Sequence, residues 1–115
     1  MTYFSRDEFK CGCGCGQNNI NELLIDKLEN IRTVLRQKII ITSGYRCEKH
    51  NLEIGGVPDS SHLKGLAADI KIQSDKYLFE ILPFTLVEFN RIGIYKTWIH
   101  VDIDSDKTGG IIWRG

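Results

Sequence analysis

The sequence predicts an α+β fold in which a small antiparallel sheet packs against two main helices. One segment carries apolar residues at the three- and four-residue spacing of an amphipathic helix, and several short runs are rich in β-branched residues, which favour strands. A chain of 115 residues has the length of one ordinary domain, and 42% hydrophobic with 26% charged residues is a globular composition. We therefore expect residues 1–115 to form a single domain with one small core.

The first half of the chain predicts a short capped element, a long helix and a strand. Ser5 and Glu8 have the spacing of a capping box, which predicts a short capped element in residues 3–9. The helix covers about residues 19–36, with the asparagine at position 19 or 21 as its N-cap. Residues 38–42 are apolar and β-branched, and are predicted to form a buried strand. The apolar positions of the helix are Ile20, Leu23, Leu24, Leu28, Ile31, Val34 and Leu35.

The second half of the chain predicts a long loop, a strand, a helix and three further β-like runs. Polar residues and turn formers dominate residues 48–64, and long ordered loops of this kind are usually functional. Residues 67–72 are predicted to form a strand, and residues 75–89 a helix that Pro83 interrupts or bends. The three β-like runs lie at residues 91–95, 98–103 and 111–113.

The charge balance argues against two classes of partner. Lysine and arginine together number 15, as do aspartate and glutamate, so no net field would attract nucleic acid or an anionic membrane. Residues 1–8 are too polar for a secretory signal, and no apolar run approaches the roughly 20 residues of a membrane span. We expect a monomer, made in the cytoplasm without a signal peptide, with neither nucleic acid nor membrane as a partner.

Four cysteines, Cys11, Cys13, Cys15 and Cys47, have no assigned role. A zinc knuckle separates its thiolates by two or more residues, and Cys-x-Cys-x-Cys does not have that spacing. We therefore predict reduced thiols in a glycine-rich turn. Two alternatives stay open: a structural metal with Cys47 as the fourth thiolate, and a disulfide between the cluster and Cys47 if the protein works outside the cell.

Polar residues that could carry chemistry lie in two separate parts of the chain. His62 is at the exit of a loop and Asp69 on the following strand, and the two can converge if Gly65 lets the backbone turn tightly. On a later strand His100 and Asp102 are two residues apart, so they point to the same face. Two imidazoles and one carboxylate suit zinc and leave a fourth position for water, which is the catalytic arrangement.

Three separated motifs extend this pattern over nearly the whole chain. They are S-x-H-x-x-G-x-A-A-D at residues 60–69, S-G-Y-R at residues 43–46 and W-I-H-V-D at residues 98–102. In this order the motifs closely resemble those of the M15 metallopeptidases, which are zinc D-alanyl-D-alanine carboxypeptidases and phage or bacterial L,D- and D,D-endopeptidases. The resemblance implies the fold that this family shares with the hedgehog signalling domain.

The resemblance also implies roles for individual residues. His62, Asp69 and His100 would bind one Zn²⁺ ion. Arg46 falls where the family places an arginine that helps to fix the substrate, and a guanidinium suits a peptide carboxylate or a polarised carbonyl oxygen. The alternative role of Arg46 is to close a turn at the surface. Ser60 would orient a neighbouring ligand, or else be a simple turn residue.

Aromatic residues and the remaining histidine are weaker candidates. Tyr45, Trp98 and Trp113 could line a substrate groove, although packing is the commoner fate of aromatics in a small domain. His50 lies in a polar segment and is expected to be solvated or to cap a turn.

At the general base the sequence departs from the family. Many members carry an acidic residue three positions before the last histidine ligand, where this chain has Thr97, which cannot accept a proton. Asp102 is the nearest substitute: it could be the base, or it could hold His100 in its metal-binding tautomer. Further candidates are Glu88, Asp104 and Asp106.

The function that the resemblance implies is hydrolysis of amide bonds in the stem or crosslink peptides of bacterial peptidoglycan by a zinc peptidase. Without a signal peptide, such an enzyme would reach the cell wall after phage lysis or as part of a virion. The alternative is a zinc-stabilised module, catalytically weak or inactive, that binds cell-wall peptide or serves as a virion component, and Thr97 motivates it. The sequence does not indicate whether the bond is D,D or L,D, nor whether cleavage is endo or exo.

Overall fold

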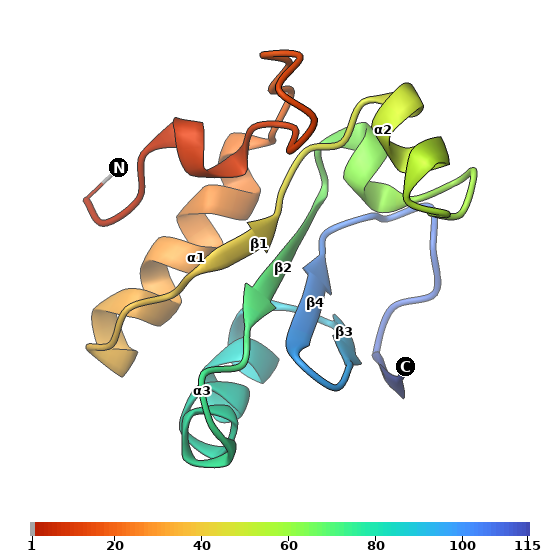
Figure 1. Cartoon of the computed structure of the whole chain (residues 1–115). Helices are drawn as coiled ribbons and strands as arrows, with labels where there is room; N and C mark the ends of the chain where they lie inside the picture. Colours follow the sequence, from red (N-terminus) through yellow and green to blue (C-terminus); the bar gives the residue numbers. More distant parts are fainter. Residues whose placement is uncertain (1) are drawn as a thin grey trace.

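A five-stranded sheet with the order β1-β2-β4-β3-β5 lies at the centre of the computed structural model, which describes residues 2–115 (Figure 1). The strands are β1 (Ile41–Ser43), β2 (Ala67–Lys71), β3 (Arg91–Ile94), β4 (Trp98–Asp102) and β5 (Ile111–Arg114). The helices are α1 (Glu22–Leu35), α2 (Glu48–Glu53) and α3 (Asp75–Glu88), with short 3₁₀ turns at η1 (Arg6–Phe9) and η2 (Ser61–Lys64). The predicted α+β class is confirmed.

The sheet departs from the predicted antiparallel arrangement at its last strand. The pairs β1–β2, β2–β4 and β3–β4 are antiparallel, whereas β5 runs parallel to β3, with Arg91 opposite Ile111 and Ile94 opposite Arg114. The chain leaves β4 at the end of the sheet where β3 begins, and residues 103–110 cross that end. Strand β5 therefore starts beside the start of β3, where the N–H of Ile111 binds the carbonyl of Asn90 at 3.0 Å, and runs in the same direction.

Helices α1 and α3 pack against each other and cover one face of the sheet (Figure 1). Helix α1 was predicted nearly to its ends, and Asn21 caps it by accepting a hydrogen bond from the N–H of Leu23. None of the helices in residues 2–115 combines the length and apolar character that a membrane crossing requires. The fully buried residues of α1 and of the strands that meet it are Leu24, Ile25, Leu28, Ile31, Ala68, Ile70, Ile99 and Val101.

Helix α3 continues through Pro83, so the predicted interruption is wrong. Proline has no N–H and leaves the carbonyl four residues earlier without its helical partner. That carbonyl belongs to Phe79, which is on the exposed side of the helix, and water can satisfy it there. The cost of the proline is reduced because the break in hydrogen bonding faces solvent.

The segment predicted as one long loop, residues 48–64, contains two short helical elements, α2 and η2. The Cys47 sulfur caps α2 by accepting from the N–H of His50, and Ser60 caps η2 by accepting from the N–H of His62. The turn after η2 has the expected form, since Gly65 is left-handed with φ 71°. A Cβ at Gly65 would lie 1.9 Å from the carbonyl oxygen of Asn19, so the tight approach also requires glycine.

Opposite faces of β2 and β4 have opposite character. In β4, Ile99 and Val101 enter the core beneath the helices, whereas His100 and Asp102 point to the other face. In β2, Asp69 lies on that same polar face, since it pairs directly with His100. These polar side chains of β2 and β4 therefore lie on the face of the sheet that the long helices leave uncovered.

The N-terminal segment is held to α1 by one carboxylate. The predicted capping box is present, with the Ser5 N–H donating to Glu8 Oε2 at 2.7 Å. Just before it, the backbone N–H groups of residues 2–4 converge on Glu29, at 2.9 Å from Tyr3 and 3.0 Å from Phe4. Burial alone would raise the pKa of Glu29, but these three hydrogen bonds outweigh it and lower the pKa.

Glu29→Gln should lower the free energy of unfolding at neutral pH by about 1–2 kcal/mol, because an amide NH₂ cannot accept the converging N–H groups. A carboxyl group with a depressed folded-state pKa stabilises the fold above its unfolded pKa, and this contribution is lost as the pH falls through the folded-state pKa. The difference between variant and unmodified protein should therefore shrink in acid. Urea unfolding at pH 7 and pH 3 measures it.

Asp26→Asn is the matched control, because Asp26 is an exposed residue of the same helix. Within residues 2–115 it makes no side-chain hydrogen bond or ion pair. A stability difference between Glu29→Gln and the unmodified protein that is the same at both pH values would contradict the assignment.

Candidate metal centre

Three side chains from three elements meet on the uncovered face of the sheet. His62 comes from η2, Asp69 from β2 and His100 from β4. Asp69 and His100 are directly opposite each other in the antiparallel ladder, so their side chains share one face. The left-handed Gly65 turns the chain between η2 and β2 and brings His62 over the same point. The three line a cleft of about 670 Å³.

The potential ligand atoms of these residues all lie within 4.8 Å of one another. Asp69 Oδ1 is 3.3 Å from His62 Nε2 and 3.1 Å from His100 Nδ1. His62 is almost fully buried, and its Nε2 is the one buried side-chain nitrogen or oxygen in residues 2–115 that makes no hydrogen bond. A buried nitrogen without a partner, beside a carboxylate and a second imidazole, fits a tetrahedral zinc site with one open position.

Hydrogen bonds on the outer edges of the two rings set their tautomers. The Nδ1 atom of His62 lies 2.7 Å from the carbonyl oxygen of Gly44. A carbonyl can only accept, so Nδ1 carries the proton and Nε2 keeps its lone pair for a metal. His100 Nε2 lies 2.7 Å from Asp102 Oδ2, which leaves His100 Nδ1 facing Asp69 and the site. Both imidazoles thus direct their inner nitrogen, His62 Nε2 and His100 Nδ1, to the same point.

Charges around the centre keep its carboxylate ionised. Burial alone would raise the pKa of Asp69, but the imidazoles of His100 and His62 beside its carboxylate lower it to about 2. Burial likewise lowers the pKa of His100, yet its contacts with Asp102 and Asp69 outweigh this and raise it. These contacts favour positive charge on His100, between two carboxylates, where a bound cation would otherwise supply it.

Arg46 lies beside the centre and is held rigidly. Its Nη2 is 3.8 Å from Asp69 Oδ2, its Nε donates to Ser43 Oγ at 3.2 Å and its Nη1 donates to Asn51 Oδ1 at 2.8 Å. Its backbone N–H also binds the carbonyl of His62 at 3.2 Å. The guanidinium lines the same cleft as the three candidate ligands.

Asn51 was missed from the sequence. It is buried, and its amide NH₂ donates to the carbonyl of Val57 at 2.9 Å while its oxygen accepts from Arg46. A Cβ at Gly56 would lie 2.1 Å from Asn51 Oδ1, so a glycine there makes room for this contact. An asparagine within a polar loop carries no signal of this role, which depends on the folded course of residues 47–57.

Asp102 occupies the outer edge of His100, on the side away from Asp69. It is 1% exposed, and its Oδ1 accepts from Arg91 Nε at 2.7 Å and from the N–H of Asp104 at 3.1 Å, while Oδ2 faces His100. Both oxygens are therefore engaged away from the ligand atoms. This geometry favours the orienting role for Asp102 over the role of general base. Arg91, which completes the arrangement, was not identified from the sequence.

The other acidic candidates lie away from the cleft. Asp104 is buried and binds Ser61 and Lys64, and Asp106 is exposed and also near Lys64. Glu88 is at the end of α3. Among the described residues, the carboxylates that line the cleft are Asp69 and Asp102 alone.

His50 is half-buried rather than solvated and lines the cleft. Its Nε2 would lie 3.5 Å from a Cβ placed on Gly12. The imidazole thus sits between the metal centre and the cysteine-rich loop, because helix α2 carries it there.

An aromatic wall borders the cleft, with one of the predicted members absent. Trp98 stacks on Tyr95 with ring centroids 4.6 Å apart, and Trp113 donates from Nε1 to the Tyr95 hydroxyl at 3.0 Å. Trp113 also approaches His100, at 5.5 Å between centroids. Tyr45 does not reach the cleft: it is buried and lines a separate groove beside the cysteines, since it points away from its neighbour Arg46. Expecting Tyr45 in the substrate groove was incorrect.

Ser60 lies in the cleft wall, where its hydroxyl accepts a hydrogen bond from the N–H of His62 at 3.3 Å. This contact fixes the backbone of a candidate ligand rather than its imidazole ring.

Comparison with protein families agrees with this geometry. The model of a family described as peptidase M15 matches residues 2–102, which include every candidate ligand. The chain belongs to the peptidase M15 family. A search of curated proteins found no match. M15 peptidases depend on zinc, and the cluster of His62, Asp69 and His100 is a site that could hold it. The match ends before β5, so Trp113 belongs to a part of the site outside the matched region.

Asp102→Asn should weaken zinc binding about 10- to 100-fold, because the uncharged amide no longer favours the proton on the outer nitrogen of His100. Competition with a chromogenic chelator measures the affinity. Asp106→Asn, which changes an exposed carboxylate in the segment after β4, should leave the zinc affinity unchanged. Full zinc affinity in Asp102→Asn together with lost hydrolysis would instead make Asp102 the base.

Proposed function

We propose that this M15 family member is a zinc peptidase that hydrolyses amide bonds in the stem or crosslink peptides of peptidoglycan. It would be of the D-alanyl-D-alanine carboxypeptidase or murein endopeptidase type. The observation that carries this proposal is the buried, unpartnered Nε2 of His62 beside Asp69 and His100, in an open cleft that also contains Arg46. A site with three protein ligands and access to solvent suits hydrolysis rather than a purely structural metal.

The side chains of the protein would bind the substrate, orient the candidate ligands and balance their charge. When bound, zinc supplies a Lewis acid that polarises a carbonyl and lowers the pKa of water to ~7. Gly44 and Asp102 hold the two imidazoles in the tautomer that leaves a lone pair toward the site. Because these supports are built into the folded chain, little reorganisation is needed when substrate binds.

Arg46 is suited to bind the anionic part of the substrate. Its Nε and Nη1 donate to Ser43 and Asn51, so the guanidinium plane is fixed before substrate arrives. The edge that faces Asp69 can donate to a terminal carboxylate or to the oxygen of the scissile carbonyl. Trp98 and Tyr95 provide an apolar wall against which a small side chain or the peptide plane can pack.

A second candidate function is a zinc-stabilised module that holds cell-wall peptide, or serves in a virion, without efficient cleavage. Two observations favour it: Thr97 stands where many relatives have an acid, and the cleft-lining carboxylates are already engaged, Asp69 with the histidines and Asp102 with His100 and Arg91. A peptidase or a peptide-binding module of this kind would act at the cell wall, which we propose the protein reaches after phage lysis or within a virion.

Zinc-loaded protein incubated with purified muropeptides of several crosslink types should release a terminal D-alanine or cut a crosslink, as read by mass spectrometry. Chelation should abolish the reaction, and Asp69→Asn should do the same because it removes a ligand. Intact muropeptides from protein with zinc shown in the His62, Asp69 and His100 site would favour the binding module.

Arg46→Lys should lower kcat/KM on the cleaved muropeptide about 100-fold while zinc stays bound. An ammonium cannot bond Ser43 and Asn51 and still offer a planar pair of donors to the substrate. Arg114→Lys, at an exposed position of β5, should behave like the unmodified protein. Equal kinetics for Arg46→Lys and Arg114→Lys would remove Arg46 from the substrate site.

A further inference from the structure

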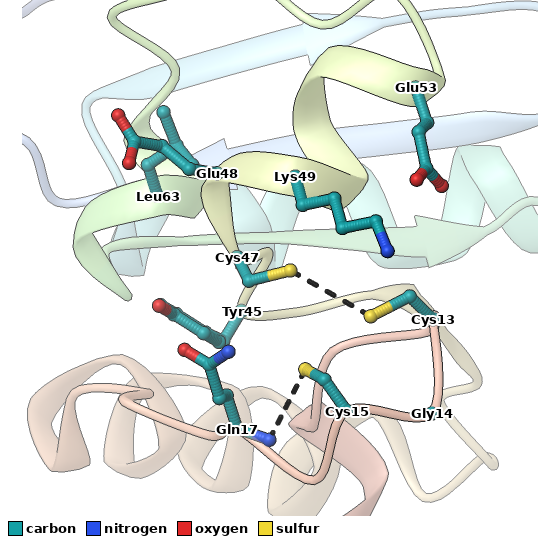
Figure 2. A pocket seen from close by; sticks show the side chains of 10 residues that line it. All are labelled: Cys13, Gly14, Cys15, Gln17, Tyr45, Cys47, Glu48, Lys49, Glu53 and Leu63. Atoms are coloured by element: carbon teal, nitrogen blue, oxygen red, sulfur yellow. Dashed lines mark hydrogen bonds between the residues drawn. The ribbon is translucent and has the colours of Figure 1, made fainter.

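A second cluster of potential metal ligands lies outside the cleft. Cys11, Cys13 and Cys15 come from the loop after η1, and Cys47 comes from the N-cap of α2. Their sulfur atoms all lie within 4.8 Å of one another. Cys13, Cys15 and Cys47 line a groove of about 770 Å³. Figure 2 shows Cys47 directed at Cys13 across it. Segments far apart in the sequence thus bring four thiols to one point.

The sulfur-to-sulfur distances are those of a thiolate cage rather than of disulfides. Cys11 lies 3.5 Å from Cys13 and 3.7 Å from Cys47, and Cys13 lies 3.7 Å from Cys47. A zinc ion bound to four sulfurs at about 2.3 Å has tetrahedral edges of about 3.8 Å. A disulfide bond is about 2.05 Å long, and all four cysteines are free thiols. Three edges of the tetrahedron are therefore already present, and Cys15 is within reach of the fourth corner.

The backbone around the cluster is arranged to support thiolates. Three backbone N–H groups donate to sulfur atoms of the cluster, each at 3.4 Å. Cys47 donates to Cys11, His50 to Cys47 and Gln17 to Cys15. Hydrogen bonds of this kind stabilise sulfur ligands and hold them in position. Glu48, Lys49 and Glu53 line the same groove (Figure 2), so the support for thiolates comes from these backbone N–H groups rather than from the charged side chains nearby.

Two glycines allow cysteines at the Cys-x-Cys-x-Cys spacing to approach one another. Gly14 has φ +83° and Gly16 has φ +79°, a left-handed conformation that L side chains rarely adopt. These turns bend the loop so that Cys13 and Cys15 face back toward Cys11. The predicted glycine-rich turn is confirmed, and its thiols are gathered with Cys47 into one cluster, as the alternative of a structural metal requires.

We propose that Cys11, Cys13, Cys15 and Cys47 bind a second zinc ion, with a structural role. Four sulfur ligands leave no open position for water, which distinguishes this site from the cleft. The ion would join the N-terminal loop to the start of α2. Because Cys47 directly follows Arg46, it would also fix the segment that carries the arginine of the cleft. The proposal does not depend on peptidase activity.

Metal analysis of the full chain, purified from zinc-supplemented cells under reducing conditions, should give about two zinc ions per chain. Cys13→Ser and Asp69→Asn each remove a ligand of one site, so each variant should retain about one. Cys13 is exposed, which makes its replacement the least disruptive in the cluster. One zinc ion in the unmodified protein, still present in Cys13→Ser and lost from Asp69→Asn, would overturn the proposal.

Cobalt substitution of the unmodified protein tests the same site without a variant. Cobalt bound by thiolates shows a sulfur-to-metal charge-transfer band in the near ultraviolet, which nitrogen and oxygen ligands cannot produce. The band should appear with about one equivalent of cobalt, persist in Asp69→Asn and weaken strongly in Cys13→Ser. Absence of the band from unmodified protein with four titratable thiols, or disulfides that form while no metal binds, would overturn the proposal.

Discussion

The direct pairing of Asp69 with His100 across β2 and β4 is the constraint on which the rest of the site depends. Side chains alternate along a strand, so a slip of β4 by one residue against β2 would turn His100 toward the core and bring an apolar residue of β4 to the cleft. The buried face prevents such a slip, because Ala68, Ile70 and Val101 pack beneath α1 and α3. The hydrophobic core thus determines the geometry of the metal centre on the opposite face.

Around that pair, each of the two candidate histidine ligands has a partner on its outer side. Gly44 supplies a backbone carbonyl to His62, and Asp102 supplies a carboxylate to His100 that is itself held by Arg91. Gly44 directly follows β1, Asp102 is the last residue of β4 and Arg91 is the first residue of β3, so several elements of the sheet contribute to the orientation of the ligands. A small domain can in this way hold a site rigid without devoting a large core to it.

Much of the fold could be predicted from the sequence because periodicity is a local signal, and the candidate ligands followed from the resemblance of three motifs to the M15 family. What could not be predicted depends on tertiary structure. Asn51 and Arg91 act through partners that only the folded loop brings near them, and β5 takes its direction from where residues 103–110 cross the sheet. The cysteines converge through the left-handed conformations of Gly14 and Gly16, which their spacing alone does not reveal.

His62 also closes a loop. Its ring Nδ1 bonds to the carbonyl of Gly44, and its carbonyl accepts from the N–H of Arg46. These two contacts join the ends of a loop whose residues 44 and 62 are 18 positions apart. Closing such a loop costs conformational entropy. Any ligand that immobilises His62 therefore stabilises the closed loop, and by thermodynamic linkage a stiffer loop strengthens binding of that ligand to the same extent. Metal affinity and the conformational order of residues 44–62, including α2, are therefore thermodynamically coupled.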